Sequence, residues 1–199
     1  MLETFPLDIA VFNAIHGLAG IAPLSDALGI FLASYLPYIL VLAVLVFVFQ
    51  RPTAKEKMGT FLTLLLAVLV SRFILADIVQ FLYPIARPFV TLGFTPLISA
   101  SGASFPSGHA SFFFALSFAL FIFDRRWGYW FLTLSFLIGL ARIFVGVHYP
   151  TDILGGIIVG LISYFIVKKL IRPERFCADS APVAPIEPIG EATTPSENA

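Results

Sequence analysis

Three polar residues at fixed spacing interrupt a long apolar stretch in the second half of the chain. Arg142, His148 and Asp152 fall within LARIFVGVHYPTDILGG, which is otherwise as apolar as a membrane span. A carboxylate four residues after an imidazole can accept one ring N–H, which fixes the tautomer and stabilises the protonated ring. The other ring nitrogen is then free to attack an electrophile. Such a group in an apolar setting indicates a functional site.

A second polar stretch, SGASFPSGHAS, precedes another long apolar run. Ser107 is suited to cap the first turn of a following helix. The free backbone N–H groups at such a helix start favour an anion, and Gly108 lets a ligand approach the backbone closely. The stretch therefore predicts either an anion site that includes His109 or an ordinary capped helix start with His109 at the membrane interface.

A third stretch, DIVQFLYPIARPF, ends a predicted span with Pro84 and places Arg87 just beyond it. Proline breaks a helix because it lacks an N–H and clashes with the preceding turn. The planar guanidinium of an arginine matches phosphate oxygens, whereas a long cationic side chain at this depth also serves as an interface anchor. Arg87 is thus interpreted as a phosphate ligand or as an anchor at the membrane surface.

Together the three stretches supply two histidines, one aspartate, two arginines, one serine and backbone N–H groups. This set can bind a phosphate and cleave it by attack from one histidine while the other protonates the leaving group. Arginines and N–H groups would stabilise the charge on the phosphate oxygens in the transition state. No metal or other cofactor is expected, because Asp152 alone does not supply the several carboxylates that would hold Mg²⁺.

The composition indicates a membrane protein. Of the 199 residues, 59% are hydrophobic and 12% are charged, whereas soluble domains carry about 25% charged residues. The formal net charge is zero, so no basic field suggests a nucleic-acid partner. Cys177 is the single cysteine, which excludes a disulfide framework and a cysteine-based metal site.

These residues must be positioned by membrane helices. We expect an all-α fold, a polytopic transmembrane helix bundle with about five spans. A helix needs about 20 apolar residues to cross the hydrocarbon core, and lipid-exposed strands cannot satisfy their backbone groups there. Pro37 predicts a kink or a break in the first span. The candidate spans are 24–49, 58–83, 107–123, 128–147 and 151–171.

The transmembrane domain is expected to occupy residues 23–171. Residues 1–22 are predicted to form a short amphipathic helix at the membrane interface, because polar residues such as Asp8 and His16 interrupt their apolar sequence. The alternative is that they form a first full span. We expect a structural or surface role for His16. Residues 172–199 are rich in proline, alanine and acidic residues, which predicts a disordered cytoplasmic tail.

Basic residues predict the orientation. Nine of the twelve lysines and arginines fall in three clusters that five crossings would bring to one side, which is cytoplasmic by the positive-inside rule. The C-terminus is then cytoplasmic, and the loops 84–106 and 147–150 face outward. The remaining cations are Arg72, Arg87 and Arg142, and the last two lie at the outer ends of spans. We therefore expect a site that faces away from the cytoplasm.

The motifs resemble those of the type 2 phosphatidic acid phosphatase superfamily, which includes lipid phosphatases and vanadium-dependent haloperoxidases. That family carries Lys-x6-Arg-Pro, Pro-Ser-Gly-His and Ser-Arg-x5-His-x3-Asp. The resemblance spans roughly residues 55 to 170. The matching residues, in the same order, are Arg87-Pro88, Pro106-Ser107-Gly108-His109, and Arg142, His148 and Asp152.

Two positions depart from the family pattern. Gln80 stands in place of the lysine of the first motif, and Ala141 in place of the serine of the third. Gln80 can donate a hydrogen bond but brings no charge. Arg72, about two helical turns deeper on roughly the same face, is a possible substitute. We favour a pairing of Arg72 with Asp77, because an unpaired arginine within a membrane is costly.

The resemblance implies a role for each matched residue. His148 would attack the phosphorus and form a phosphohistidine, with Asp152 orienting its ring. His109 would be the general acid for the leaving group. The phosphate would be held by Arg87, Arg142, Ser107 and the Gly108 N–H, with the uncharged Gln80 as the weakest member.

An active site among helices at the outer membrane surface indicates a phosphate carried by a lipid of the bilayer. The short chain and small loops are similar to bacterial undecaprenyl-diphosphate phosphatases of the bacitracin-resistance type. Hydrolysis of phosphatidylglycerophosphate or phosphatidic acid is the second expectation. A small anion or proton transporter is a remote alternative, because the polar groups lie at one face and no internal repeat is evident.

Overall fold

The computed structural model describes residues 6–171, and every regular element in that range is helical. The expectation of an all-α fold is therefore confirmed. The predicted tail at 172–199, including Cys177, and residues 1–5 of the predicted N-terminal helix lie outside the described residues. In chain order, with η marking π-helical segments, the elements are α1 (Pro6–His16), α2 (Pro23–Ile30), η1 (Phe31–Tyr35), α3 (Leu36–Phe49), α4 (Ala54–Val68), η2 (Leu69–Ala76), α5 (Asp77–Leu82), α6 (Pro88–Leu92), α7 (Gly108–Leu120), α8 (Arg125–Phe144) and α9 (Pro150–Ile171).

Within residues 6–171, four continuous helices are long and apolar enough to cross a membrane, and α7 is apolar but shorter. These helices match the predicted spans to within a few residues. α7 ends at Leu120 rather than at residue 123, and at about 1.5 Å per residue it falls short of a hydrocarbon core about 30 Å thick. A helix enclosed by other helices tolerates that length because its ends do not face lipid. The four long helices are Pro23–Phe49, Ala54–Leu82, Arg125–Phe144 and Pro150–Ile171.

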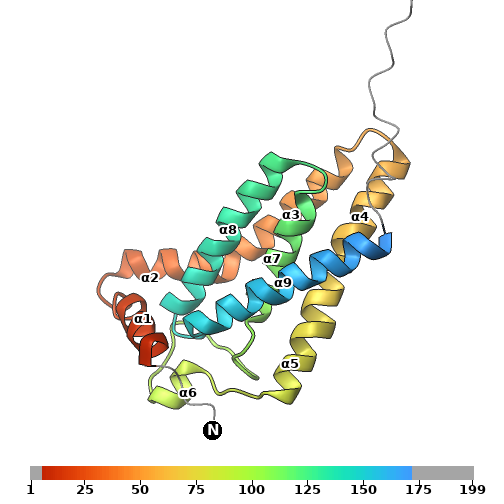
Figure 1. Ribbon diagram of the computed structural model, residues 1–199. Helices are drawn as coiled ribbons and strands as arrows, with labels where there is room; N and C mark the ends of the chain where they lie inside the picture. Colours follow the sequence, from red (N-terminus) through yellow and green to blue (C-terminus); the bar gives the residue numbers. More distant parts are fainter. Residues whose placement is uncertain (1–5, 172–199) are drawn as a thin grey trace, which may run out of the picture.

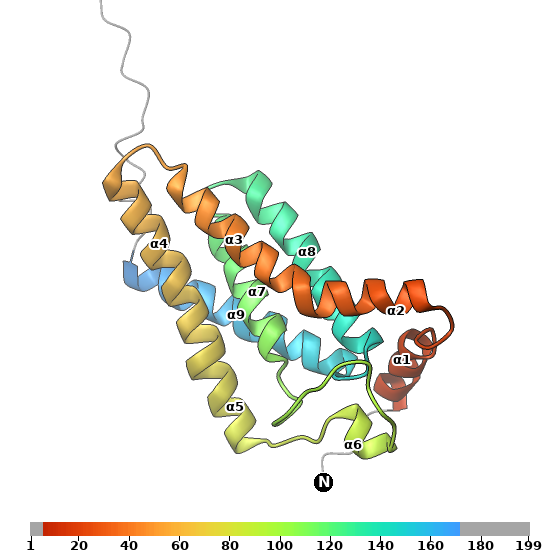
Figure 2. The same cartoon turned by 180° about the vertical axis from the view of Figure 1, so that it is seen from behind.

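α7 lies at the centre of the bundle, with α4, α8 and α9 around it (Figures 1 and 2). Two glycines let α9 approach closely: a Cβ at Gly156 would lie 2.4 Å from Ala110 Cβ, and one at Gly160 would lie 2.7 Å from the α7 backbone. On the α8 side, the hydroxyl oxygens of Ser117 and Ser135 are 2.9 Å apart. Small residues and hydrogen-bonded hydroxyls are typical of packed membrane helices, so they explain how α7 is held.

Two of the spans contain a π-helical segment, a wider turn that is frequent at functional sites. η1 directly precedes α3, whose first turn contains Pro37, where a missing N–H removes no helical hydrogen bond. Pro23–Phe49 stays one continuous helix but changes direction between α2 and α3 (Figure 2), so the first span is kinked rather than broken, just before the proline. η2 separates α4 from α5 and carries Arg72.

The two ends of the bundle differ in their polar residues. The predicted site residues lie where α5 ends, α7 begins and α8 turns into α9, at the lower end in Figure 1. The α3–α4 and α7–α8 connections and the C-terminal end of α9 lie toward the opposite end. The described basic residues of that end are Arg51, Lys55, Lys57, Arg125, Arg126, Lys168 and Lys169.

α1 packs beside the turn that joins α8 to α9. The buried Asp8 carboxylate accepts hydrogen bonds from the Thr151 N–H at 3.0 Å and from Thr151 Oγ1 at 2.6 Å, in the first turn of α9. His16 Nδ1 donates to the carbonyl oxygen of Phe144 at 2.8 Å, which is a structural contact. α1 therefore supports both ends of the turn, while its position at the membrane interface stays a prediction.

Candidate active site

His148 lies in the tight turn between α8 and α9. Val145 caps α8, Gly146 has a φ of +86°, and Pro150 begins α9. A positive φ suits glycine, and here a Cβ would also lie 2.7 Å from the Phe94 ring. The turn is therefore too compact for another residue at 146. It buries His148 one helical turn before Asp152, as the spacing predicted.

Three hydrogen bonds converge on one oxygen of Asp152. Its Oδ2 accepts from the Tyr149 N–H at 2.8 Å and from Ser104 Oγ at 2.5 Å, and it lies 3.2 Å from His148 Nδ1. Both His148 and Asp152 are 1% exposed. Because a carboxylate only accepts, Nδ1 must carry the proton in the His148–Asp152 hydrogen bond.

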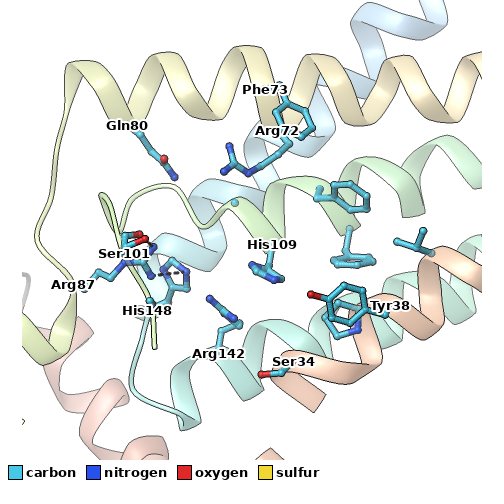
Figure 3. Close-up of a pocket in the computed structure, with 16 residues that line it drawn as sticks. Ser34, Tyr38, Arg72, Phe73, Gln80, Arg87, Ser101, His109, Arg142 and His148 are labelled. Atoms are coloured by element: carbon cyan, nitrogen blue, oxygen red, sulfur yellow. Dashed lines mark hydrogen bonds between the residues drawn. The ribbon is translucent and has the colours of Figure 1, made fainter. Parts of the chain in front are cut away.

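The other ring nitrogen of His148 faces a cation. Arg87 Nη1 lies 3.3 Å from His148 Nε2, the contact drawn as a dashed line in Figure 3. A guanidinium only donates, so Nε2 accepts and has a lone pair. Burial lowers the pKa of His148 to about 4, although the hydrogen bond to Asp152 opposes that change. The ring is thus neutral at pH 7, with Nε2 and its lone pair pointing away from Asp152.

Arg87 binds the two loops of the site together. It donates to the Val147 carbonyl at 3.0 Å, and to the carbonyls of three consecutive loop residues. Those three are Ser101 at 2.9 Å, Gly102 at 3.1 Å and Ala103 at 3.3 Å. The sequence predicts Arg87 as a phosphate ligand or as an anchor at the membrane surface. These hydrogen bonds join it to carbonyl oxygens of the protein and not to the membrane surface. Its Nη1 group is the part that reaches His148.

The stretch 107–109 begins α7, as predicted. Ser107 is the N-cap, and its Oγ accepts from the Ala110 N–H at 3.5 Å. The Ser107 N–H donates to the backbone carbonyl of Asp152 at 3.0 Å, which ties the start of α7 to the start of α9. Ser107 is fully buried by these contacts, whereas Gly108 and His109 line a cavity.

Arg142 is a buried cation without a carboxylate partner among the described residues. It comes from the last turn of α8, is 7% exposed, and lines the same cavity as His109 and His148. Its Nε atom is buried and has no hydrogen-bond partner within residues 6–171. A buried, unsatisfied charge of this kind is expensive and calls for an explanation, which a bound anion supplies.

The cavity has a volume of about 470 Å³ and joins a polar end to an apolar end. His148 and Arg87 lie at the polar end, and His109 and Arg142 lie next to them (Figure 3). Away from His148, the wall becomes apolar. Tyr38 and Phe73 lie in that part (Figure 3), and the other apolar residues that line the cavity include Pro37, Val41, Phe112 and Phe113.

Gln80, which stands in place of the family lysine, and Arg72, its possible substitute, also line the cavity. Gln80 lines it and donates from Nε2 to the Pro106 carbonyl at 2.9 Å. Arg72 lines it as well and forms an ion pair with Asp77, which confirms the predicted pairing. Gln80 thus supports the loop before α7, and Arg72 is the cation on this wall.

Sequence reasoning missed Ser104. Its hydroxyl is fully buried and makes the shortest of the three contacts to Asp152 Oδ2, from a loop 48 residues earlier. No pattern marks this serine among the small residues around it, because its role depends on how the loop folds over α9. Among residues 6–171, no group of three or more His, Cys, Asp or Glu side chains could hold a metal ion.

The family model of the PAP2 superfamily matches residues 57–175 of the chain. That range contains all three sequence motifs, whereas Pro37, Tyr38 and Val41 of the cavity wall lie before it. The chain is 33% identical over 163 residues to the bacitracin transport permease protein BcrC of Bacillus licheniformis, an alignment that covers 81% of this chain and 79% of the relative.

A second relative is the undecaprenyl-diphosphatase BcrC of Bacillus subtilis, 30% identical over 173 residues, which cover 84% of this chain and 87% of that protein. The fold is similar to the crystal structure of Aquifex aeolicus LpxE, with a TM-score of 0.70 and 29% identity over 85% of this chain and 99% of that one. Together with the site geometry, these matches show that the chain belongs to the PAP2 superfamily and is a multi-pass membrane enzyme that hydrolyses phosphate esters of lipids.

Proposed function

We propose that the enzyme removes the terminal phosphate of undecaprenyl diphosphate at the outer face of the bacterial cytoplasmic membrane. The observation that carries the proposal is the buried Arg142, whose Nε has no partner within the described helices, beside His148 and His109 in one cavity. The cavity continues into apolar side chains, which suits a phosphate attached to a lipid. The similarity to the B. subtilis undecaprenyl-diphosphatase supports this choice of lipid.

The reaction begins with attack by His148. Its Nε2 lone pair forms a bond to the terminal phosphorus while the bridging P–O bond breaks, and lipid monophosphate leaves. His109, on the same cavity wall, donates a proton to the leaving oxygen. Asp152 accepts the Nδ1–H and stabilises the positive charge that the ring gains.

Hydrolysis of the phosphohistidine completes the cycle. His109, now neutral, removes a proton from a water molecule, whose oxygen attacks the phosphorus as the N–P bond breaks. The products are inorganic phosphate and the neutral ring of His148. Arg142, Arg87 and Gly108 line the cavity, and their N–H groups stabilise the phosphate oxygens in both steps. No metal takes part in this scheme.

The outward orientation is part of the proposal. Seven described lysines and arginines lie toward the end of the bundle opposite the site, and the positive-inside rule assigns that end to the cytoplasm, with the C-terminus. Cysteines introduced at Thr95 and at Thr53 test it. In intact cells, a membrane-impermeant thiol reagent should label residue 95 and leave residue 53 unlabelled, and the reverse pattern would contradict the orientation.

Phosphate release from undecaprenyl diphosphate by the purified full-length protein tests the function. We expect turnover that persists in EDTA, is blocked by vanadate, and falls by at least about 10⁴-fold in His148→Ala. Parallel assays with phosphatidylglycerophosphate and phosphatidic acid measure the alternative substrates. A higher kcat/KM on either would replace the proposed lipid, and full activity of His148→Ala would contradict the mechanism.

A further inference from the structure

Arg72 is a cation of the cavity that the mechanism above does not use. It comes from η2, in the second long helix, and faces the cavity across from α7 and α8. Figure 3 shows Arg72 and Gln80 extending from one helix toward His109 and Arg142. An ion pair with Asp77 explains how a charge is tolerated there, but it does not explain why the guanidinium lies on the cavity wall.

The contacts of Arg72 hold its guanidinium over the start of α7. Nη1 donates to Asp77 Oδ1. On the other side, Nε lies so near Gly108 that a Cβ at residue 108 would be only 2.6 Å from it. Since a guanidinium carries five N–H groups and Asp77 accepts one, further donors remain for a ligand. The absence of a side chain at Gly108 therefore lets the guanidinium of Arg72 lie against the start of α7.

The groups along the cavity follow a fixed order. His148 lies at one end, His109 and Arg142 come next, and Arg72 lies on the wall toward Phe73 and the apolar part (Figure 3). A lipid diphosphate has its groups in the same order: the phosphate to be removed, the phosphate that remains, and the apolar chain. With the terminal phosphate at His148 and Arg142, the second phosphate falls near Arg72.

We propose that Arg72 binds the inner phosphate of a lipid diphosphate, the one that stays on the lipid, and so selects diphosphates over monophosphates. This inference rests on the proposed function and adds a specificity-determining residue to it. A lipid monophosphate bound at His148 has no second phosphate to offer, so it gains nothing from Arg72. The charge of Arg72 also stabilises the lipid monophosphate as it leaves, because negative charge develops on that phosphate as the bridging bond breaks.

Variants at residue 72 test this inference. In Arg72→Gln, kcat/KM for undecaprenyl diphosphate should fall roughly 10- to 100-fold, the usual effect of losing a charge-assisted hydrogen bond. For phosphatidic acid it should stay within about threefold, which also shows that the variant is folded. Arg72→Lys keeps the charge and should recover part of the diphosphate activity.

Asp77→Asn is the matched control for a purely structural ion pair. The amide oxygen can still accept from Arg72, so the ratio of diphosphate to monophosphate activity should stay within about threefold of the wild type. The inference is overturned if Arg72→Gln lowers activity on both lipids equally, or if Asp77→Asn changes the ratio as much as Arg72→Gln does.

Competitive inhibition gives a second measurement. Methylenediphosphonate, which is not hydrolysed, carries two phosphorus groups, and inorganic phosphate carries one. Arg72→Gln should raise the inhibition constant of the former at least about tenfold and leave that of the latter unchanged. Equal changes would contradict the role of Arg72. Wild-type protein inactive on undecaprenyl diphosphate would instead contradict the proposed function, so the two failures are distinguishable.

Discussion

The turn that carries His148 and the cavity in front of it differ in how their polar groups are satisfied. In the turn, Asp152 Oδ2 accepts three hydrogen bonds, and Arg87 donates to four backbone carbonyls. In the cavity, Arg142 has a buried Nε without a partner among the described residues. Arg87, Arg142 and Asp152 are all buried, so the difference between these side chains does not come from their own exposure to solvent.

The comparison separates positioning from binding. The hydrogen bonds of Asp152 and Arg87 hold one geometry, and that geometry is the ring orientation of His148. An unsatisfied buried cation costs free energy in the empty protein and recovers it when an anion binds. We therefore expect substitutions in the turn to lower stability together with activity, and substitutions in the cavity to lower activity alone.

After His148→Ala, the largest effect within the cavity is expected for His109→Ala. Loss of the general acid lowers kcat for undecaprenyl diphosphate by roughly 10² to 10⁴-fold, with the thermal unfolding midpoint close to that of the wild type. A substrate whose leaving group is p-nitrophenol needs less protonation, so the variant should lose much less activity on it. An equal loss on both substrates would exclude His109 as the acid.

Replacing each of the two site arginines by alanine should sharpen the comparison between the turn and the cavity. Arg142→Ala should lower kcat/KM about 10²-fold, because a phosphate ligand is lost, and should leave the unfolding midpoint unchanged or raised. Arg87→Ala should lower activity and also destabilise the fold by about 2–4 kcal/mol, because four carbonyls lose their donor. Activity assays and thermal unfolding of both variants measure this. If Arg142→Ala were the less stable of the two, the distinction would be wrong.

Ser104→Ala should have a smaller effect. Asp152 keeps the Tyr149 N–H and the His148 ring as donors, so the loss of one hydrogen bond should lower kcat about three- to tenfold and stability by about 1 kcal/mol. Ser104→Thr retains the hydroxyl and is the control for a lost hydrogen bond. A variant with wild-type kcat would show that two donors suffice to orient Asp152.

The smallest effect is expected when the pH is lowered from 7 to 5, because the protonation state of His148 should not change in that range. Its pKa is lowered to about 4 by burial, so the ring stays neutral above that pH, whereas an exposed histidine is protonated below about pH 6.5. Imidazole ¹⁵N shifts of the three histidines, assigned with His148→Ala, should show His148 in the Nδ1–H tautomer from pH 7 to pH 5. Protonation near pH 6.5 would contradict the burial of the nucleophile.

The sequence by itself determined the helices and the local contacts of the site. Apolar runs of about 20 residues leave a membrane chain no alternative to helices, and Pro150 sets where α9 begins. His148 and Asp152 then meet because they are four residues apart at a helix start, a local relation that spacing alone expresses. The Ser107 cap and the Arg72–Asp77 pair are equally local, and the structure confirms both.

Only the tertiary structure decided which groups are satisfied and which are left for a ligand. Ser104 reaches Asp152 from 48 residues away, and Arg87 meets the carbonyl of Val147 from 60 residues away. Neither contact follows from a residue type or a spacing, because each depends on how the loop before α7 folds over the α8–α9 turn. The same packing leaves Arg142 without a partner for its Nε and places Arg72 against Gly108, since helices that approach each other bring together side chains that the sequence keeps apart.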